Sequence, residues 1–255
     1  MQATFAGVLG AIMGSFLNVV VHRLPRHESL ISPASHCPTC ETPIRPYDNV
    51  PILSWLLLRG RCRGCGARIS ARYPLLEAGT ALLCIGAVLT NGSVVGVALG
   101  VTLVLALVPA AAIDLEHRII PNVITGTGAV LALALGTALD PSGEPVRLIA
   151  GAGAGGFLLL AALAHPAGMG MGDVKLAGMM GLFLGAAVAP ALLLALLAGV
   201  LAGVLVIARS HAHEGGVRSA GKTGIPFGPF LALGGLAGIF AGQAAIDWYT
   251  TTFLH

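Results

Sequence analysis

The sequence predicts an all-α polytopic membrane protein with about eight transmembrane helices and a small polar insertion after the first helix. Of its 255 residues, 56% are hydrophobic and only 10% are charged, whereas soluble domains carry about 25% charged residues. The mean hydropathy is +0.88. A chain of this composition cannot cover its surface with polar groups in water, which excludes a soluble globular protein.

Eight apolar runs approach the roughly 20 residues that cross about 30 Å of hydrocarbon. The first is expected to remain as a membrane helix, because no basic residue precedes it and no A-x-A cleavage site follows it. The segment 174–208 is too long for one helix, and Pro190 near its middle predicts a tight turn between two short spans; one kinked, tilted helix is the alternative. The predicted spans are residues 3–22, 75–90, 95–113, 120–139, 147–164, 174–188, 190–208 and 227–247.

Small residues recur at the four-residue spacing that lets membrane helices approach closely. Each such pattern is weak evidence alone, because the chain contains 36 glycines. The pattern occurs at Gly10/Gly14, Gly151/Gly155, Gly199/Gly203 and Gly234/Gly238/Gly242.

The distribution of Lys and Arg predicts the orientation, because cytoplasmic loops retain these residues. With the N-terminus in the periplasm, all but one of the 14 Lys and Arg residues lie on the cytoplasmic side, and Arg147 alone lies outside. We therefore expect a multi-pass protein of a bacterial inner membrane.

Residues 23–74 form a polar, proline-rich insertion that is too short to bury a core without a cross-link or metal. Its many arginines are interpreted as marking the inner face, where they can touch lipid phosphates. Nucleic acid is not expected as a partner, because the insertion lacks the interleaved aromatic residues of a base-stacking surface. The predicted organisation is a first transmembrane helix at 1–22, a cytoplasmic insertion at 23–74 and a transmembrane bundle at 75–255.

Four cysteines of the insertion form two CxxC pairs, Cys37/Cys40 and Cys62/Cys65. Two such pairs supply the four thiolates of a closed tetrahedral zinc site, which leaves no position for water and is therefore structural. Two disulfides are the alternative, but the predicted cytoplasmic location is reducing. Cys84 lies in the second predicted span and is interpreted as a small buried apolar residue.

Two aspartates stand at predicted helix ends on the same, cytoplasmic, boundary of the membrane. Asp114 ends the third span, and Asp173 follows a glycine-rich segment at the start of the sixth. Ionisable groups in such positions are costly and suggest function. Two adjacent carboxylates share one proton, and such a pair performs general acid–base hydrolysis of peptides. Alternatively, Asp114 pairs with Arg118 and Asp173 caps the helix that follows it.

The segment Gly168–Lys175 resembles the GxGD signature of membrane aspartyl proteases, and its Gly-Met-Gly-Asp-Val-Lys-Leu run resembles the type IV prepilin peptidase family in particular. The two CxxC pairs are similar to the cysteine pattern of that family, and the similarity extends over nearly the whole chain. Further similar blocks are 14–20, 22–25, 48–51, 59–62, 72–74, Glu77 and 225–232.

The resemblance implies that Asp114 and Asp173 are catalytic and that Gly170, Gly172 and Lys175 belong to a substrate-binding or active-site loop. It implies cleavage of prepilin or pseudopilin leader peptides after a Gly, on the cytoplasmic side. It further implies N-methylation of the new N-terminus with S-adenosylmethionine, an activity associated with the cysteine-bearing insertion. No glycine-rich βαβ motif independently indicates S-adenosylmethionine.

Two other classes of protein also account for parts of the sequence. A proton-coupled transporter would use membrane aspartates, but it would place them near mid-span and show inverted repeats, which we do not find. A non-catalytic membrane scaffold with a zinc module explains the cysteines but gives the two aspartates no role.

Overall fold

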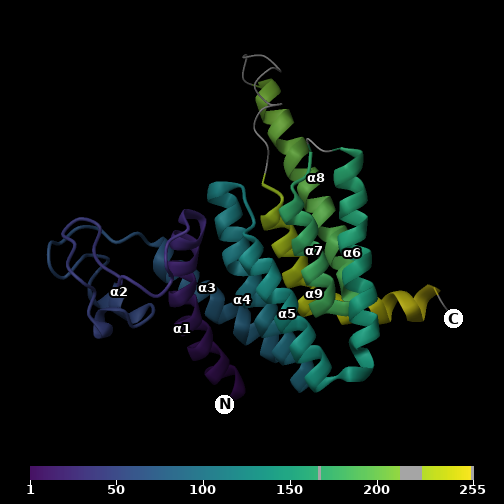
Figure 1. The fold of residues 1–255 in the computed structure, drawn as a ribbon, viewed down its shortest axis with the longest axis horizontal. Coiled ribbons are helices and arrows are strands. Elements are labelled where there is room, and N and C mark those ends of the chain that lie inside the picture. The colour runs from purple at the N-terminus through teal and green to yellow at the C-terminus, as the bar shows by residue number, and fades with distance from the viewer. Residues whose placement is uncertain (166–167, 213–225, 254–255) are drawn as a thin grey trace. The chain divides into compact units, whose positions relative to one another are not determined.

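The computed structural model describes residues 1–165, 168–212 and 226–253, and within these ranges its regular elements are helices, with two isolated β-bridges in the insertion. It divides into two compact units, residues 1–109 and 110–255. Short 3-10 turns join several of the helices (Figure 1). The α-helices are α1 (Gln2–Arg23), α2 (Leu53–Leu57), α3 (Arg72–Thr90), α4 (Val94–His117), α5 (Asn122–Leu139), α6 (Glu144–Ala164), α7 (Met171–Leu184), α8 (Val188–Ala212) and α9 (Gly228–Phe253).

The predicted fold class, an all-helical membrane protein, is confirmed. Within the described residues, seven stretches are long and apolar enough to cross a membrane. One of them, Met171–Arg209, has 39 residues and contains both α7 and α8. With α7 and α8 taken separately, the long helices match the predicted set of about eight.

The break between α7 and α8 lies at the 3-10 turn Gly185–Ala187, so the prediction of a turn at Pro190 is wrong. Gly185 has a φ of +55°, a conformation that glycine adopts readily. Pro190 instead lies in the first turn of α8, where a helix tolerates proline. A Cβ added to Gly238 of α9 would lie 2.8 Å from a methyl carbon of Leu184 and 3.2 Å from the Cβ of Ala191. The end of α7 and the start of α8 thus both lie against Gly238 of α9, as expected where a turn joins two helices.

In the first unit, α1 packs on α3 through two of the predicted small residues. A Cβ at Gly10 would lie 2.9 Å from the Cα of Ala81, and one at Gly14 would lie 2.8 Å from the Cα of Glu77. Real Cβ atoms do not approach other atoms this closely, so only glycine permits the observed spacing of the two helices.

The insertion is tied to these helices by hydrogen bonds from buried polar groups. The backbone N–H of Ile52 donates to Oε2 of Glu77 at 2.8 Å. Asn18 of α1 donates through Nδ2 to the carbonyl oxygen of Tyr73 at 3.2 Å. Both Glu77 and Asn18 are buried, so their polar atoms need these partners.

In the second unit, glycines again set the helix spacing. A Cβ at Gly181 of α7 would lie 2.6 Å from the Cα of Gly151 in α6, and one at Gly242 of α9 would lie 2.6 Å from the Cβ of Ala187. The prediction is not confirmed at every position, because a Cβ at Gly203 would meet nothing within 4 Å.

Arg147, the one cation that the orientation argument places outside, is neutralised by two carboxylates. Its Nη1 donates to Oδ2 of Asp140 at 2.8 Å, and its Nη2 donates to Oε2 of Glu144 at 3.0 Å. Nη2 also donates to the carbonyl oxygen of Gly136 at 3.2 Å. This cluster fastens the end of α5 to the start of α6.

Candidate active site and metal centre

Asp114 lies in the last turn of α4 and is held by the first residue of α9. Its side chain is buried, with the residue 5% exposed. Its Oδ2 accepts a hydrogen bond from the backbone N–H of Gly228 at 2.9 Å. Because the donor is a backbone N–H, which cannot rotate away as a side chain can, this bond fixes one oxygen and the orientation of the carboxylate.

Asp173 lies in the first turn of α7 and is 9% exposed. Asp173 is close enough to Asp114 for their charges to interact, and its neighbour Gly172 lies against Ile120, in the segment that follows Asp114. The N-cap of α7 is Gly170, and its backbone N–H bonds the carboxylate of Asp173, so Asp173 also caps the start of this helix from its first turn. The charge of Arg118 also acts on Asp114, which lies in the same helix end.

The predicted loop residues Gly170 and Gly172 lie beside Asp173 and have different surroundings. Gly170 is extended, with φ −78° and ψ 145°, and a Cβ there would lie 3.4 Å from Oδ2 of Asp173. A Cβ on Gly172 would lie 3.0 Å from the Cβ of Ile120. Gly172 therefore lets α7 approach the α4–α5 connection, and Gly170 keeps the space beside the Asp173 carboxylate free of a side chain.

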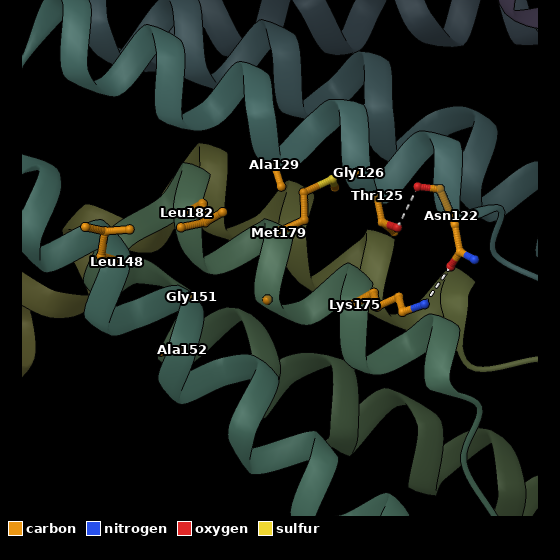
Figure 2. A pocket seen from close by; sticks show the side chains of 11 residues that line it. Asn122, Thr125, Gly126, Ala129, Leu148, Gly151, Ala152, Lys175, Met179 and Leu182 are labelled. Carbon is orange, nitrogen blue, oxygen red and sulfur yellow. Dashed lines mark hydrogen bonds between the residues drawn. The ribbon is translucent and has the colours of Figure 1, made fainter.

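Lys175, the third predicted loop residue, contacts a different group. Its Nζ donates to Oδ1 of Asn122 at 2.8 Å (Figure 2). Residues two apart on a helix do not face the same side, so Lys175 projects from the side of α7 that is opposite to Asp173.

The four insertion cysteines converge as the predicted metal site requires. Their four sulfur atoms lie within 4.8 Å of one another, with Cys37 Sγ to Cys65 Sγ at 3.8 Å and Cys40 Sγ to Cys62 Sγ at 3.9 Å. Zn–S bonds of about 2.3 Å in a tetrahedron place sulfurs about 3.8 Å apart, whereas a disulfide joins them at about 2.05 Å. The cysteines therefore fit one zinc ion and form no disulfide in this structure.

The two cysteine pairs have matching local structure. The N–H of Cys37 bonds the carbonyl oxygen of Thr42 at 3.0 Å, and the N–H of Cys62 bonds that of Ala67 at 2.8 Å. Hydrogen bonds from the backbone of Thr39 and Cys40 lower the pKa of the Cys37 thiol to about 6. The first turn thus favours the thiolate form that binds metal, whereas hydrogen bonds with the other cysteine sulfurs raise the pKa of Cys65 to about 11.

Comparison with known proteins gives two consecutive family matches. Residues 8–91 match the bacterial peptidase A24 N-terminal domain, and residues 101–207 match the type IV leader peptidase family. A prepilin leader peptidase/N-methyltransferase of Aeromonas hydrophila is 37% identical over 95% of this chain and 92% of the relative. This chain belongs to the type IV leader peptidase family.

Other members are similarly close. The type 4 prepilin-like proteins leader peptide-processing enzyme of Escherichia coli O78:H11 is 37% identical, over 92% of each chain. A prepilin leader peptidase/N-methyltransferase of Pseudomonas putida is 35% identical, over 94% of this chain and 91% of the relative. No solved structure matches the chain significantly.

The predicted family and class of enzyme, a membrane aspartic peptidase that is also an N-methyltransferase, are therefore confirmed. Its apolar spans and its family make the chain a multi-pass protein of the inner membrane. Membership of an enzyme family also removes the basis for the transporter and scaffold interpretations.

Gly228 is a site residue that the sequence did not reveal. It lies in the Phe-Gly-Pro-Phe block at 227–230, which carried part of the family resemblance, but nothing in that block indicated a contact with Asp114. A Cβ on Gly228 would lie 2.7 Å from Oδ2 and 3.0 Å from the Cβ of Asp114. The glycine is therefore required for the carboxylate to stand where it does.

Changing Gly228→Ala should displace the Asp114 carboxylate and lower the rate of leader-peptide cleavage at least tenfold. Gly153→Ala is the matched control, because a Cβ there meets nothing within 4 Å. Cleavage of a leader-bearing precursor by purified protein measures the effect, with thermal unfolding in detergent as the check on folding. Normal cleavage by a folded Gly228→Ala variant would show that the observed position of Asp114 is not needed.

Purified protein should contain one zinc ion per chain, and changing any of Cys37, Cys40, Cys62 or Cys65 to Ser should lower this content severalfold. Loss of one ligand opens the closed site and removes binding energy that folds the insertion. Elemental analysis by mass spectrometry measures the metal. Cys84→Ala is the control, because Cys84 lies outside the cluster, and undiminished zinc in all four Ser variants would contradict the site.

Proposed function

We propose that this chain removes the leader peptide from type IV prepilins or pseudopilins by cutting after a Gly at the cytoplasmic boundary of the inner membrane. The observation that supports the proposal is that Asp114 and Asp173, two buried carboxylates at the ends of different helices, are close enough for their charges to interact. The relatives named as prepilin leader peptidases support the class of substrate.

The two carboxylates supply both halves of peptide hydrolysis. The ionised member takes a proton from a water molecule as the water oxygen attacks the scissile carbonyl carbon, and the protonated member donates a hydrogen bond to the carbonyl oxygen. The departing amine then receives a proton as the C–N bond breaks. The Gly228 N–H holds one oxygen of Asp114, which leaves the other oxygen available to the water or the substrate.

The segment before α7 suits an extended substrate. A peptide bond inside a helix is shielded from attack, so the scissile region must extend beside the carboxylates. Gly170 is itself extended and places no side chain near Oδ2 of Asp173. We assign Gly170 and Gly172 to this substrate-facing loop. Lys175 remains a predicted member of the loop, although its present hydrogen bond is with Asn122.

We further propose that the same chain N-methylates the new N-terminal residue. The free amine attacks the methyl carbon of the S-adenosylmethionine sulfonium group, the carbon–sulfur bond breaks, and the amine then loses a proton. The relatives named as N-methyltransferases support this second activity. Zinc held by the four cysteines keeps the insertion folded and takes no part in either reaction.

Asp114→Asn and Asp173→Asn should each lower cleavage at least a thousandfold, and the double variant should be hardly worse than either single one. The reason is that the pair acts as one unit, and removing either member removes the shared proton. Rates of precursor cleavage in membranes measure the effect, with the exposed Asp247→Asn as the control. Normal processing by a folded Asp114→Asn variant would reject the dyad.

The side of the membrane that each helix end faces can be tested with single exposed cysteines introduced at opposite ends of the helices. Ser142→Cys, in the α5–α6 connection, should react with a membrane-impermeant thiol reagent in intact cells whose outer membrane has been permeabilised. Arg118→Cys, in the α4–α5 connection, should react only in inside-out vesicles, after subtraction of the signal of the unsubstituted protein. Both sites are exposed. The reverse pattern would place the dyad at the periplasmic boundary and reject the proposed orientation.

A further inference from the structure

A groove in the second unit lies on the face of α7 that carries Lys175 and not Asp173. It lies between α5 and α6, with α7 as its floor, and its volume is about 590 Å³. Glycine, alanine and apolar side chains form most of its walls, and Lys175, Asn122 and Thr125 lie together at one end (Figure 2). The groove is therefore apolar along its length and polar at the end where α5 and α7 begin.

This groove faces away from the catalytic pair. Asp173, Leu176 and Met180 are buried on one face of α7. Lys175 and Leu182, which line the groove, lie half a helical turn away, because each residue advances the helix by about 100°. The thickness of α7 thus separates the groove from the carboxylates.

The charge at the polar end is not balanced inside the groove. Lys175 is the one charged residue among the described residues that line it. Its partner Asn122 is a neutral amide, which accepts through Oδ1 and has a second nitrogen group, Nδ2, that can donate. An ammonium group and an amide donor at the mouth of an apolar groove match an anionic head group on an apolar chain.

We propose that this groove binds an anionic glycerophospholipid, with one phosphate oxygen at Lys175 and Asn122 and an acyl chain along α7. The charge favours a lipid over an apolar helix of a protein substrate, because such a helix would bring no anion to Lys175 at the polar end of the groove. A site of several hundred Å³ suits a small ligand.

The chain offers a matched pair of variants to test this proposal. A Cβ at Gly126 would meet no atom within 4 Å, although the residue lines the groove, so Gly126→Leu should fill the groove without a clash. Gly153→Leu is its control, because Gly153 is also exposed and its Cβ would also meet nothing within 4 Å, but it does not line the groove. Ala152→Leu, exposed on the opposite wall, replaces Gly126→Leu should that variant fail to fold.

Native mass spectrometry of the whole protein, with phosphatidylglycerol or phosphatidylethanolamine added to the micelle, measures the bound lipid. The unsubstituted protein should retain phosphatidylglycerol preferentially, and Gly126→Leu should lower this binding at least fivefold while Gly153→Leu leaves it unchanged. Lys175→Gln should remove the preference between the two lipids, and Arg209→Gln, which changes an exposed cation outside the groove, should keep it.

Three results would overturn the proposal. One is equal binding of phosphatidylglycerol by the folded groove-filling variant and its Gly153→Leu control, and another is an unchanged lipid preference in Lys175→Gln. The third is a severalfold higher KM for a leader-bearing precursor in Gly126→Leu, together with competition between that precursor and phosphatidylglycerol, because the groove would then belong to the substrate.

Discussion

Contact between helix backbones at glycine is the constraint on which the rest of this structure depends. Lipid chains are as apolar as leucine, so burial of apolar area does not drive helices together, and close van der Waals packing must do so. The α6–α7 contact at Gly151 and Gly181 and the α8–α9 contact between Ala191 and Gly234 leave no space for a Cβ. These contacts fix the positions of α7 and α9 along the helices they pack against, and hence the positions of their first residues.

The geometry of the proposed active site follows from those two helix starts. The start of α7 carries Asp173, and the start of α9 carries Gly228, whose N–H bonds Asp114 at the end of α4. A carboxylate is expensive to bury unless hydrogen bonds satisfy it, and a backbone N–H does so without adding charge. The proposed site can therefore keep one carboxylate oriented without a direct ion pair, which would favour the ionised form over a proton shared within the pair.

The sequence was sufficient to predict features that depend only on residues close together in the chain. Hydropathy predicted the helices, and the CxxC spacing predicted a cysteine cluster whose sulfur separations suit zinc. It failed where two arrangements are locally equivalent: Pro190 and Gly185 can both interrupt a helix, and the choice depends on where α9 packs. The contact of Gly228 with Asp114 joins residues that are distant in the sequence. The outward direction of Lys175 depends on the rotation of α7, which its low amphipathicity does not specify.

Hydrolysis at a membrane boundary requires that water and an extended peptide reach carboxylates that are otherwise shielded. Residues in the middle of a long helix could not meet this requirement, because their backbone is closed and their surroundings exclude water. At a helix end the backbone can leave the helical conformation, as Gly170 does just before Asp173. Asp173 is thus held by the rigid first turn of α7 beside Gly170, which adds no side chain next to the carboxylate. The combination places the proposed acid–base pair beside space for a substrate, and it gives the glycine at position 170 a role.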